Sequence, residues 1–414
     1  MQAVHNPQDL GIDPFERDVA HVVERVRGLF TSVIEAVCSG GPRAHEIAEA
    51  FRIHRKLGWQ IWNVAYGRGR IGAIRHMPSR RGIQAWLKAA KETGVPDDLL
   101  GQIEQASELF ESLQHTHATD REMLEMMIES CDPRFDKRAE EKRRKQAFVG
   151  NSFIWGVRAN TYLTTLVLHP SRREGYFDMA RVHGLIGLVR MRPNVRWPFA
   201  QAVVHSGEGE RFPTREPLVV SEFTRRSGVP LIPEFCSQPL PPVQRREGQY
   251  GMLEDELLPG PMGQTGESTV VTGEVVRELA PKYKTQPGED AMFGTGVRTP
   301  CETLVYDHLV HRSVFPKLER DLRVFSELIS PVSRDERDLL QVSEQIQDLG
   351  RGTARLRIAE IPRYMELMNV VLAKIGCKAD DFSLFRVRMR YPPLPVAVML
   401  HHDLPDPPDG FEFA

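Results

Sequence analysis

The chain has 414 residues, of which 41% are hydrophobic and 27% charged, and its formal net charge is −2. This mixture is typical of globular proteins and unlike that of disordered, collagen-like or membrane-spanning chains. At about 100–200 residues per domain, the length predicts two or three domains. Residues 1–15 lack the basic start and apolar core of a signal peptide, and no apolar run reaches the ~18 residues of a membrane span. We therefore expect a cytoplasmic protein of bacterial type that does not enter a membrane.

The cysteines are odd in number, widely spaced and without a CxxC pair (Cys38, Cys131, Cys236, Cys301 and Cys377). This pattern indicates neither a disulfide framework nor a cysteine-rich zinc site, so we expect buried free thiols. The chain also lacks GxSxG, GxGxxG and GxxxxGK[ST]. We expect no cofactor and no metal, and the absence of these signatures favours a protein that is not an enzyme.

The first 130 residues have the apolar spacing of helices almost throughout. The run Ser39-Gly40-Gly41-Pro42 separates the first helix from the second. A polar bend at 115–119 divides the last helical stretch. Predicted helices, in chain order, cover residues 18–37, 43–51, 55–66 and 83–90, with two more within 97–130.

Beyond a charged stretch at 137–145, strand-like patterns appear. The Pro- and Gly-rich passage 230–298 is too long for one loop of a compact domain, so short strands are expected in it. Predicted strands lie at 148–169, 202–205, 218–223, 268–276, 385–391 and 396–400, and predicted helices at 176–188 and 358–375. The fold class is α+β, with three parts: an all-helical helix-turn-helix domain (1–95), an acidic helical connector and candidate dimerisation segment (96–147), and a larger β-containing domain that binds a ligand or partner (148–414).

Charge is distributed unevenly along the helical region. Between Arg43 and Lys91 there are eleven Lys and Arg residues and two acids, whereas between Asp97 and Glu129 there are nine acids and one base. Such asymmetry indicates that the basic surface meets a polyanion while the acidic segment faces solvent or folds back.

A helix-turn-helix needs a small residue on the first helix, apolar residues beside the turn and apolar anchors on the second helix. Here Ala48 is the small residue, Phe51 and Ile53 flank the turn, and Leu57 and Ile61 are the anchors. Nearby polar and basic side chains can bind phosphates or base edges. The candidate nucleic-acid-binding residues are Arg52, His54, Arg55, Lys56, Gln60, Asn63, Arg68, Arg70, Arg80 and Arg81.

This segment, from about Phe30 to Lys91, resembles the winged-helix regulators of the MarR and IclR kind. The resemblance implies a DNA-binding domain of a transcriptional regulator. The sequence departs from the usual pattern at three places. Arg52 stands where glycine is common, Gly58 stands where an apolar anchor is usual, and 67–81 is a poor β-hairpin for a wing. The partners we expect are DNA, a second copy of the chain in a homodimer, and a small molecule or protein bound by the C-terminal domain.

Two other functions stay open. The chain could be a self-assembling structural protein whose basic N-terminal part only neutralises nucleic acid. Asp307, His308 and His311 could also converge on a metal in a hydrolase if their segment were helical, although packing or surface histidines are the better interpretation. Arg386, Arg388 and Arg390 alternate along a predicted strand, which favours a solvated strand face.

Overall fold

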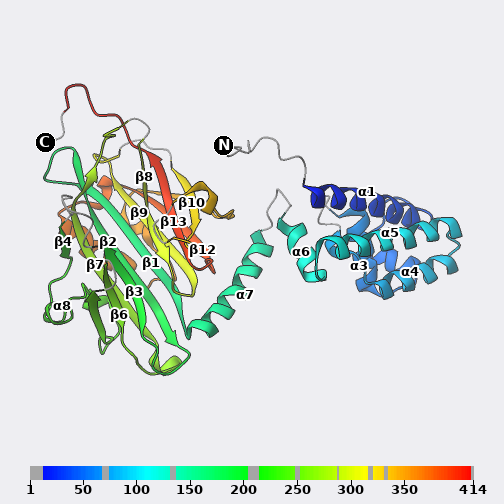
Figure 1. The fold of residues 1–414 in the computed structure, drawn as a ribbon, viewed down its shortest axis with the longest axis horizontal. Coiled ribbons are helices and arrows are strands. Elements are labelled where there is room, and N and C mark those ends of the chain that lie inside the picture. The colour runs from blue at the N-terminus through cyan, green and yellow to red at the C-terminus, as the bar shows by residue number, and fades with distance from the viewer. Residues whose placement is uncertain are drawn as a thin grey trace, which may run out of the picture. The chain divides into compact units, whose positions relative to one another are not determined.

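The computed structural model describes residues 13–67, 74–130, 137–203, 214–247, 252–286, 289–315, 320–330 and 334–411. The chain divides into two compact units, Met1–Glu140 and Glu141–Ala414. The first unit is helical and the second is built mainly of strands (Figure 1). The fold is therefore α+β, with a helical N-terminal part followed by a larger sheet-containing part. None of the described helices is both long enough and apolar enough to cross a bilayer.

The helices of the first unit pack around one apolar core, which includes Phe30, Ile47, Ile61 and Trp86. The acidic helix α5 packs along α1 and α4, so the segment expected as a connector from residue 96 belongs to the same compact unit as the preceding helices. The helices described there are α1 (Pro14–Glu35), α2 (Ala44–Ala50), α3 (Arg55–Tyr66), α4 (Arg80–Glu92), α5 (Asp97–His117) and α6 (Arg121–Ser130), and α7 (Lys137–Trp155) contains the division between the units.

Local chemistry explains where these helices begin and end. Asp13 accepts a hydrogen bond from the backbone N–H of Phe15, and Pro14 occupies the first position of α1. Helix α3 covers the predicted range 55–66. At its C-terminal end, Arg27 of α1 donates to the carbonyls of Val64 and Gly67, where a cation also complements the helix dipole.

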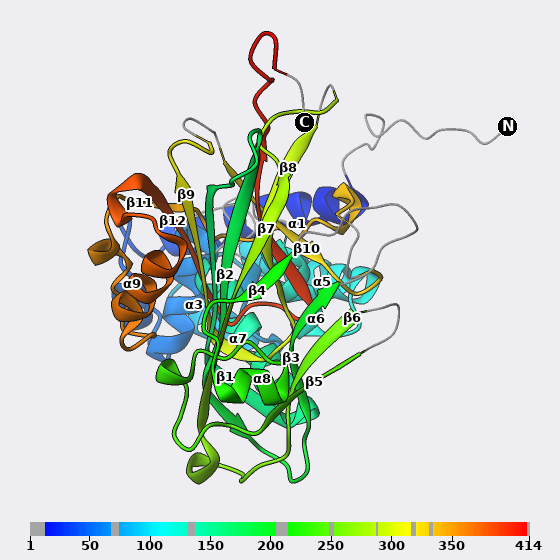
Figure 2. The ribbon, with the colours of Figure 1, turned by 90° about the vertical axis from the view of Figure 1, so that its left-hand side faces the viewer.

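The strands of the second unit form three sheets (Figure 2). The seven-stranded sheet has the order β11-β12-β9-β1-β2-β7-β4, and the smaller sheets have the orders β10-β13-β8 and β3-β6-β5. The strands are β1 (Val157–Pro170), β2 (Tyr176–Arg190), β3 (Trp197–Val203), β4 (Arg215–Pro217), β5 (Val243–Glu247), β6 (Met252–Leu257), β7 (Ser268–Pro281), β8 (Asp290–Val297), β9 (Cys301–His311), β10 (Asp321–Ser326), β11 (Gln347–Gly350), β12 (Phe382–Arg390) and β13 (Val396–Asp403), and the helices are α8 (Glu222–Ser227) and α9 (Tyr364–Ile375).

Both faces of the large sheet are covered. On β1, the Thr165 hydroxyl shares a hydrogen bond with Tyr364 of α9, whereas Tyr162 and Thr164 bond to Gly296 and Thr295 of β8 on the opposite face. On that opposite face, the ring of His183 on β2 also stacks on Phe199 of β3. Helix α9 therefore covers one face of the sheet, and the two smaller sheets cover the other.

The face toward α9 contains a buried ion pair that corrects the expectation of a solvated arginine face. Arg386 is only 4% exposed, and its guanidinium donates two hydrogen bonds of 2.7 Å to the carboxylate of Asp307. The Tyr364 hydroxyl donates to the same carboxylate. Arg388 pairs with Glu360 and Arg390 donates to Thr303. The prediction is therefore wrong for Arg386, whereas Arg388 is exposed and Arg390 half-buried. Alternation cannot show which cation of a strand face is buried in an ion pair.

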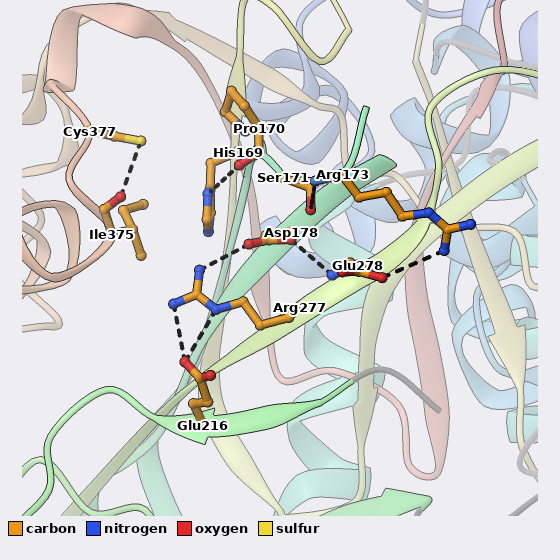
Figure 3. A network of polar contacts seen from close by, with 10 residues as sticks. All are labelled: His169, Pro170, Ser171, Arg173, Asp178, Glu216, Arg277, Glu278, Ile375 and Cys377. Atoms are coloured by element: carbon orange, nitrogen blue, oxygen red, sulfur yellow. Dashed lines mark hydrogen bonds and ion pairs between the residues drawn. The ribbon is translucent and has the colours of Figure 1, made fainter. Parts of the chain in front are cut away.

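A second polar network joins the neighbouring strands β2, β7 and β4 (Figure 3). Arg277 donates to the buried carboxylate of Asp178 and also to Glu216. The backbone N–H of Glu278 donates to the other oxygen of Asp178, and Arg173 pairs with Glu278. Both oxygens of Asp178 are thus engaged, and the network holds the short strand β4 against β7.

Three sequence predictions in this unit are wrong. Residues 176–188 form β2 instead of a helix, because a strand buried on both faces loses the alternating pattern and can imitate helical spacing. Residues 148–155 belong to α7, so β1 starts only at Val157. In 218–223, expected as a strand, the chain leaves β4 and enters α8, which Ser221 caps by accepting from the Thr224 N–H.

The cysteines in the described residues are free thiols, as the spacing predicts. Cys236 and Cys301 are buried, whereas Cys38 and Cys377 are half-buried. Burial raises the pKa of Cys236 to about 11, so this thiol stays protonated and unreactive near neutral pH.

Candidate nucleic-acid interface

A tight turn joins the end of α2 to the start of α3. Arg52 has a φ of 53°, which is the left-handed conformation that favours glycine at this place. Its N–H donates to the Glu49 carbonyl, and the N–H of Ile53 donates to the Ala48 carbonyl. This pair of bonds is a Schellman motif, which ends α2 and redirects the chain into α3. Arg52 therefore differs from the glycine common at this place in residue type, but it adopts the backbone conformation that glycine favours.

The second departure from the expected pattern, Gly58, is explained by the contact between α2 and α3. A Cβ at Gly58 would lie 2.8 Å from the Cβ of Ala48 and 2.9 Å from the Ala44 carbonyl oxygen. The two helices thus approach so closely that only glycine fits. Ala48 is buried, as expected for the small residue of the motif, and Ile61 is a fully buried anchor.

The outward face of α3 combines charged, amide and aromatic side chains. Arg55 and Lys56 are exposed in the first turn, and Gln60 and Asn63 are half-buried further along. Trp59, one turn after Arg55, is 48% exposed and contacts the His76 ring edge-to-face at 4.8 Å. At 3.6 residues per turn, these side chains share one face, opposite Gly58 and Ile61.

The first turn of α4 lies beside that of α3 (Figure 1). A Cβ at Gly82 would lie 3.3 Å from Leu57 of α3, so the two helix starts are in contact. Arg80 and Arg81 are both exposed there. The described basic residues of the predicted set therefore lie close together, in the turn before α3 and at the starts of α3 and α4. They are Arg52, Arg55, Lys56, Arg80 and Arg81.

The acidic segment folds back on part of the basic one. Three bases of the basic segment have acidic partners on α5 and α6. These ion pairs are Arg75–Glu129 at 3.2 Å, Arg80–Glu111 at 3.8 Å and Lys91–Asp97 at 2.9 Å. By contrast, Arg52, Arg55, Lys56 and Arg81 have no acidic side chain within 4 Å among the described residues. The unpaired positive charge is thus concentrated around the start of α3.

Two predicted residues have local structural roles. His54 is the N-cap of α3, and its Nδ1 accepts a 3.2 Å hydrogen bond from the Lys56 N–H. Asn63 donates at 2.8 Å to the Trp59 carbonyl within the helix. Arg68 and Arg70 lie outside the described residues. Trp59 is not among the predicted residues, although its position one turn from Arg55 on the polar face could have revealed it.

The residues considered for a metal site do not converge. They lie on strand β9, where Asp307 and His308 point to opposite faces, and Asp307 is held by Arg386 and Tyr364. The ring of His311 bonds to Ser313. No group of three or more His, Cys, Asp and Glu suited to a metal is found in the part of the chain that the structure describes.

The chain matches no known protein-family model, no curated protein and no solved structure.

Proposed function

We propose that the protein binds DNA through the outward face of α3 and regulates transcription in the cytoplasm. The observation that carries the proposal is the start of α3, where Arg55 and Lys56 are exposed and, among the described residues, without an acidic partner, directly after the tight turn that ends α2. Proteins of this kind place the N-terminal residues of the second helix against base edges in the major groove.

The chemistry of the face supports this proposal. Arg and Lys can bind phosphates or guanine edges, and Gln can pair with adenine. Arg81, at the neighbouring start of α4, is positioned to contact the adjacent phosphate backbone. A wing is not needed for this contact, because the side chains that carry the proposal lie on α3 and at the start of α4. A homodimer would present two such helices to successive turns of a duplex.

The test is a salt titration of DNA binding by the full chain, using random-sequence and genomic duplexes. The variant Arg55→Glu/Lys56→Glu is compared with Arg17→Glu/Arg25→Glu, which makes the same charge change on the exposed face of α1. We expect only the α3 variant to lose affinity, and its salt slope to fall by about two, at ~0.9 per phosphate contact. Equal affinity and slope for the α3 variant and the unmodified chain would refute the proposal.

Sedimentation of the free protein tests the competing assembly function. A monomer or dimer agrees with a regulator, whereas large closed or open assemblies would favour a structural protein whose basic unit only neutralises nucleic acid. The two measurements are independent, since the first reports on α3 and the second on self-association.

A further inference from the structure

The second unit contains a large cavity between the layers of its sheets. Its volume is about 1190 Å³, somewhat above the ~300–1,000 Å³ usual for ligand sites. Strands β1, β2 and β7 form its floor, and β3 on one side and β8 with β13 on the other form its walls. The cavity thus lies between the large sheet and the two smaller sheets that pack on this face.

Most of the lining is apolar, and much of it is aromatic. The aromatic residues are Trp155, Tyr162, Trp197, Phe199 and Phe293. The indole N–H of Trp197 donates at 2.9 Å to Thr299 and the Tyr162 hydroxyl donates at 2.7 Å to the Gly296 carbonyl, so neither ring turns a free donor to the cavity. An occupant would therefore meet these rings mainly through their apolar surfaces, which favours an apolar body.

The charges in the lining are mostly positive and mostly paired. Glu327, whose side chain is 2% exposed, lies 3.0 Å from Arg298 and 3.4 Å from Arg334. Arg196 pairs at 3.2 Å with Glu256. These ion pairs account for three of the four arginines that line the cavity in the described part of the chain.

Arg181 is the exception. It projects from the centre of β2 onto the cavity floor, half-buried, and no acidic side chain lies within 4 Å of it among the described residues. The acids nearest to it already have partners, because Asp255 is held by Arg245 at 2.6 Å and Glu274 by Arg215 at 2.6 Å. Glu274 lies opposite Arg181 in the β2–β7 register, but neither it nor Asp255 is within ion-pair distance of the guanidinium. A carboxylate in the cavity would therefore give this half-buried cation a direct partner.

We propose that this cavity binds an elongated apolar molecule that carries one carboxylate, with the carboxylate held by Arg181. The fork of the guanidinium matches a carboxylate with two parallel hydrogen bonds. The apolar body lies between the aromatic walls of β3 and β8. This function belongs to the second unit and does not depend on DNA binding by the first.

The test is calorimetric titration of the full chain, without DNA, with three twelve-carbon probes. These are dodecanoate, the neutral 1-dodecanol and the cationic dodecyltrimethylammonium, all below their aggregation limits. We expect one dodecanoate per chain, at least tenfold weaker binding of dodecanol, and no binding of the cation. No binding of dodecanoate to the folded protein would overturn the proposal.

Three variants locate the site. Arg181→Met weakens dodecanoate at least tenfold and leaves dodecanol unchanged, and Arg181→Lys restores part of the loss. The matched control, Arg196→Met, removes a lining cation that already has a partner and changes dodecanoate binding less than threefold. Ala200→Trp, which fills the cavity from β3, abolishes binding of both probes.

Retained dodecanol binding shows that Arg181→Met is folded. For Ala200→Trp, a cooperative thermal unfolding transition shows that the variant is folded. If Arg181→Met binds dodecanoate as the unmodified chain does, the assignment of Arg181 is wrong. If Ala200→Trp binds it unchanged, the ligand occupies another surface, and the proposal fails.

Discussion

Gly58 of α3 faces Ala48 of α2 so closely that a side chain at position 58 would place its Cβ 2.8 Å from the Cβ of Ala48. This contact sets the separation of the two helices whose turn defines the candidate nucleic-acid interface. The expected sequence pattern has an apolar anchor at this position, whereas in the structure the missing side chain of Gly58 lets α2 and α3 pack closely.

Substituting Gly58 by alanine should therefore destabilise the helical unit. The added methyl group must push α2 and α3 apart, and overpacking of this kind costs about 1–3 kcal/mol. The measurement is the free energy of unfolding from urea denaturation followed by circular dichroism.

Gly101→Ala is the matched control. Gly101 lies in α5, and a Cβ at this position would meet no neighbouring atom within 4 Å, so alanine should increase stability by about 1 kcal/mol through helix propensity. If both variants were stabilised alike, the close approach of α2 and α3 would be incorrect.

Arg52→Gly should stabilise the same unit. The left-handed conformation at Arg52 costs a residue with a Cβ about 1–2 kcal/mol, and glycine removes this strain. Glycine also gives the unfolded chain more conformational freedom, which offsets part of the stabilisation. We expect a net increase of about 0.5 kcal/mol in the free energy of unfolding. Arg52→Ala removes the same charge but keeps the strain, and should show no increase. A gain of equal size in both variants would assign the effect to charge instead.

The helical unit could be predicted largely from the sequence because its helices carry one apolar stripe each and glycines follow the ends of α3 and α4. The range 55–66 agrees with α3 for this reason. The packing of α5 against α1 was not predictable, because an amphipathic helix does not specify which neighbour covers its apolar face.

The second unit was harder to predict for a physical reason. Strand β2 is buried on both faces, so its sequence has no alternation and imitates the spacing of a helix. The pairing of Asp307 with Arg386 depends on the register between β9 and β12, which local patterns do not determine. The cavity and its unpaired Arg181 depend on three sheets and were likewise beyond sequence reasoning.

Removing one partner of the buried Asp307–Arg386 pair should be strongly destabilising. Asp307→Asn leaves a guanidinium buried without its counter-charge, and losses of about 3–5 kcal/mol are typical of such sites. The check is chemical denaturation of the full chain, with the transition of the second unit followed separately.

The double variant Asp307→Asn/Arg386→Met provides the control for this pair. Because it removes the uncompensated charge, it should lose clearly less than the sum of the two single variants. Additive losses would mean that the two side chains do not interact as their 2.7 Å contacts indicate.

The stability of the second unit should fall as the pH is lowered from 6.5 to 4. Burial lowers the pKa of His402 to about 4, with Arg320 and His401 acting in the same direction and Asp321 and Asp290 opposing them. The unfolded chain therefore binds a proton at His402 before the folded chain does. The difference between this pKa and the 6.5 of an unperturbed histidine corresponds to about 3 kcal/mol of unfolding free energy. This stability is lost progressively between pH 6.5 and 4, and the loss is complete below pH 4.

His402→Phe should make the fall of stability with decreasing pH shallower in that window, because phenylalanine keeps the stacking on Phe293 and removes the titration.

His401→Gln should change the stability in a different pH window. Asp321 and Asp290 raise the pKa of His401 against its burial, so its contribution is complete below pH 6.5 and is lost as the pH rises through its folded pKa. Urea midpoints measured from pH 4 to 9 check both variants, and identical profiles would contradict these assignments.

Trp59→Ala distinguishes an interface from a merely basic surface. If α3 lies against DNA, truncating this half-exposed ring should weaken binding about 5- to 30-fold, as for a tryptophan central to an interface. The salt slope should stay unchanged, since no charge is removed. The matched control is Trp155→Ala, which truncates a ring of similar exposure in the second unit and should leave DNA affinity unchanged. Only direct contact of the ring with the nucleic acid predicts a loss of affinity at a constant salt slope. If the affinity of Trp59→Ala is unaltered, α3 has no role in recognition, even if Arg55 and Lys56 attract the polyanion.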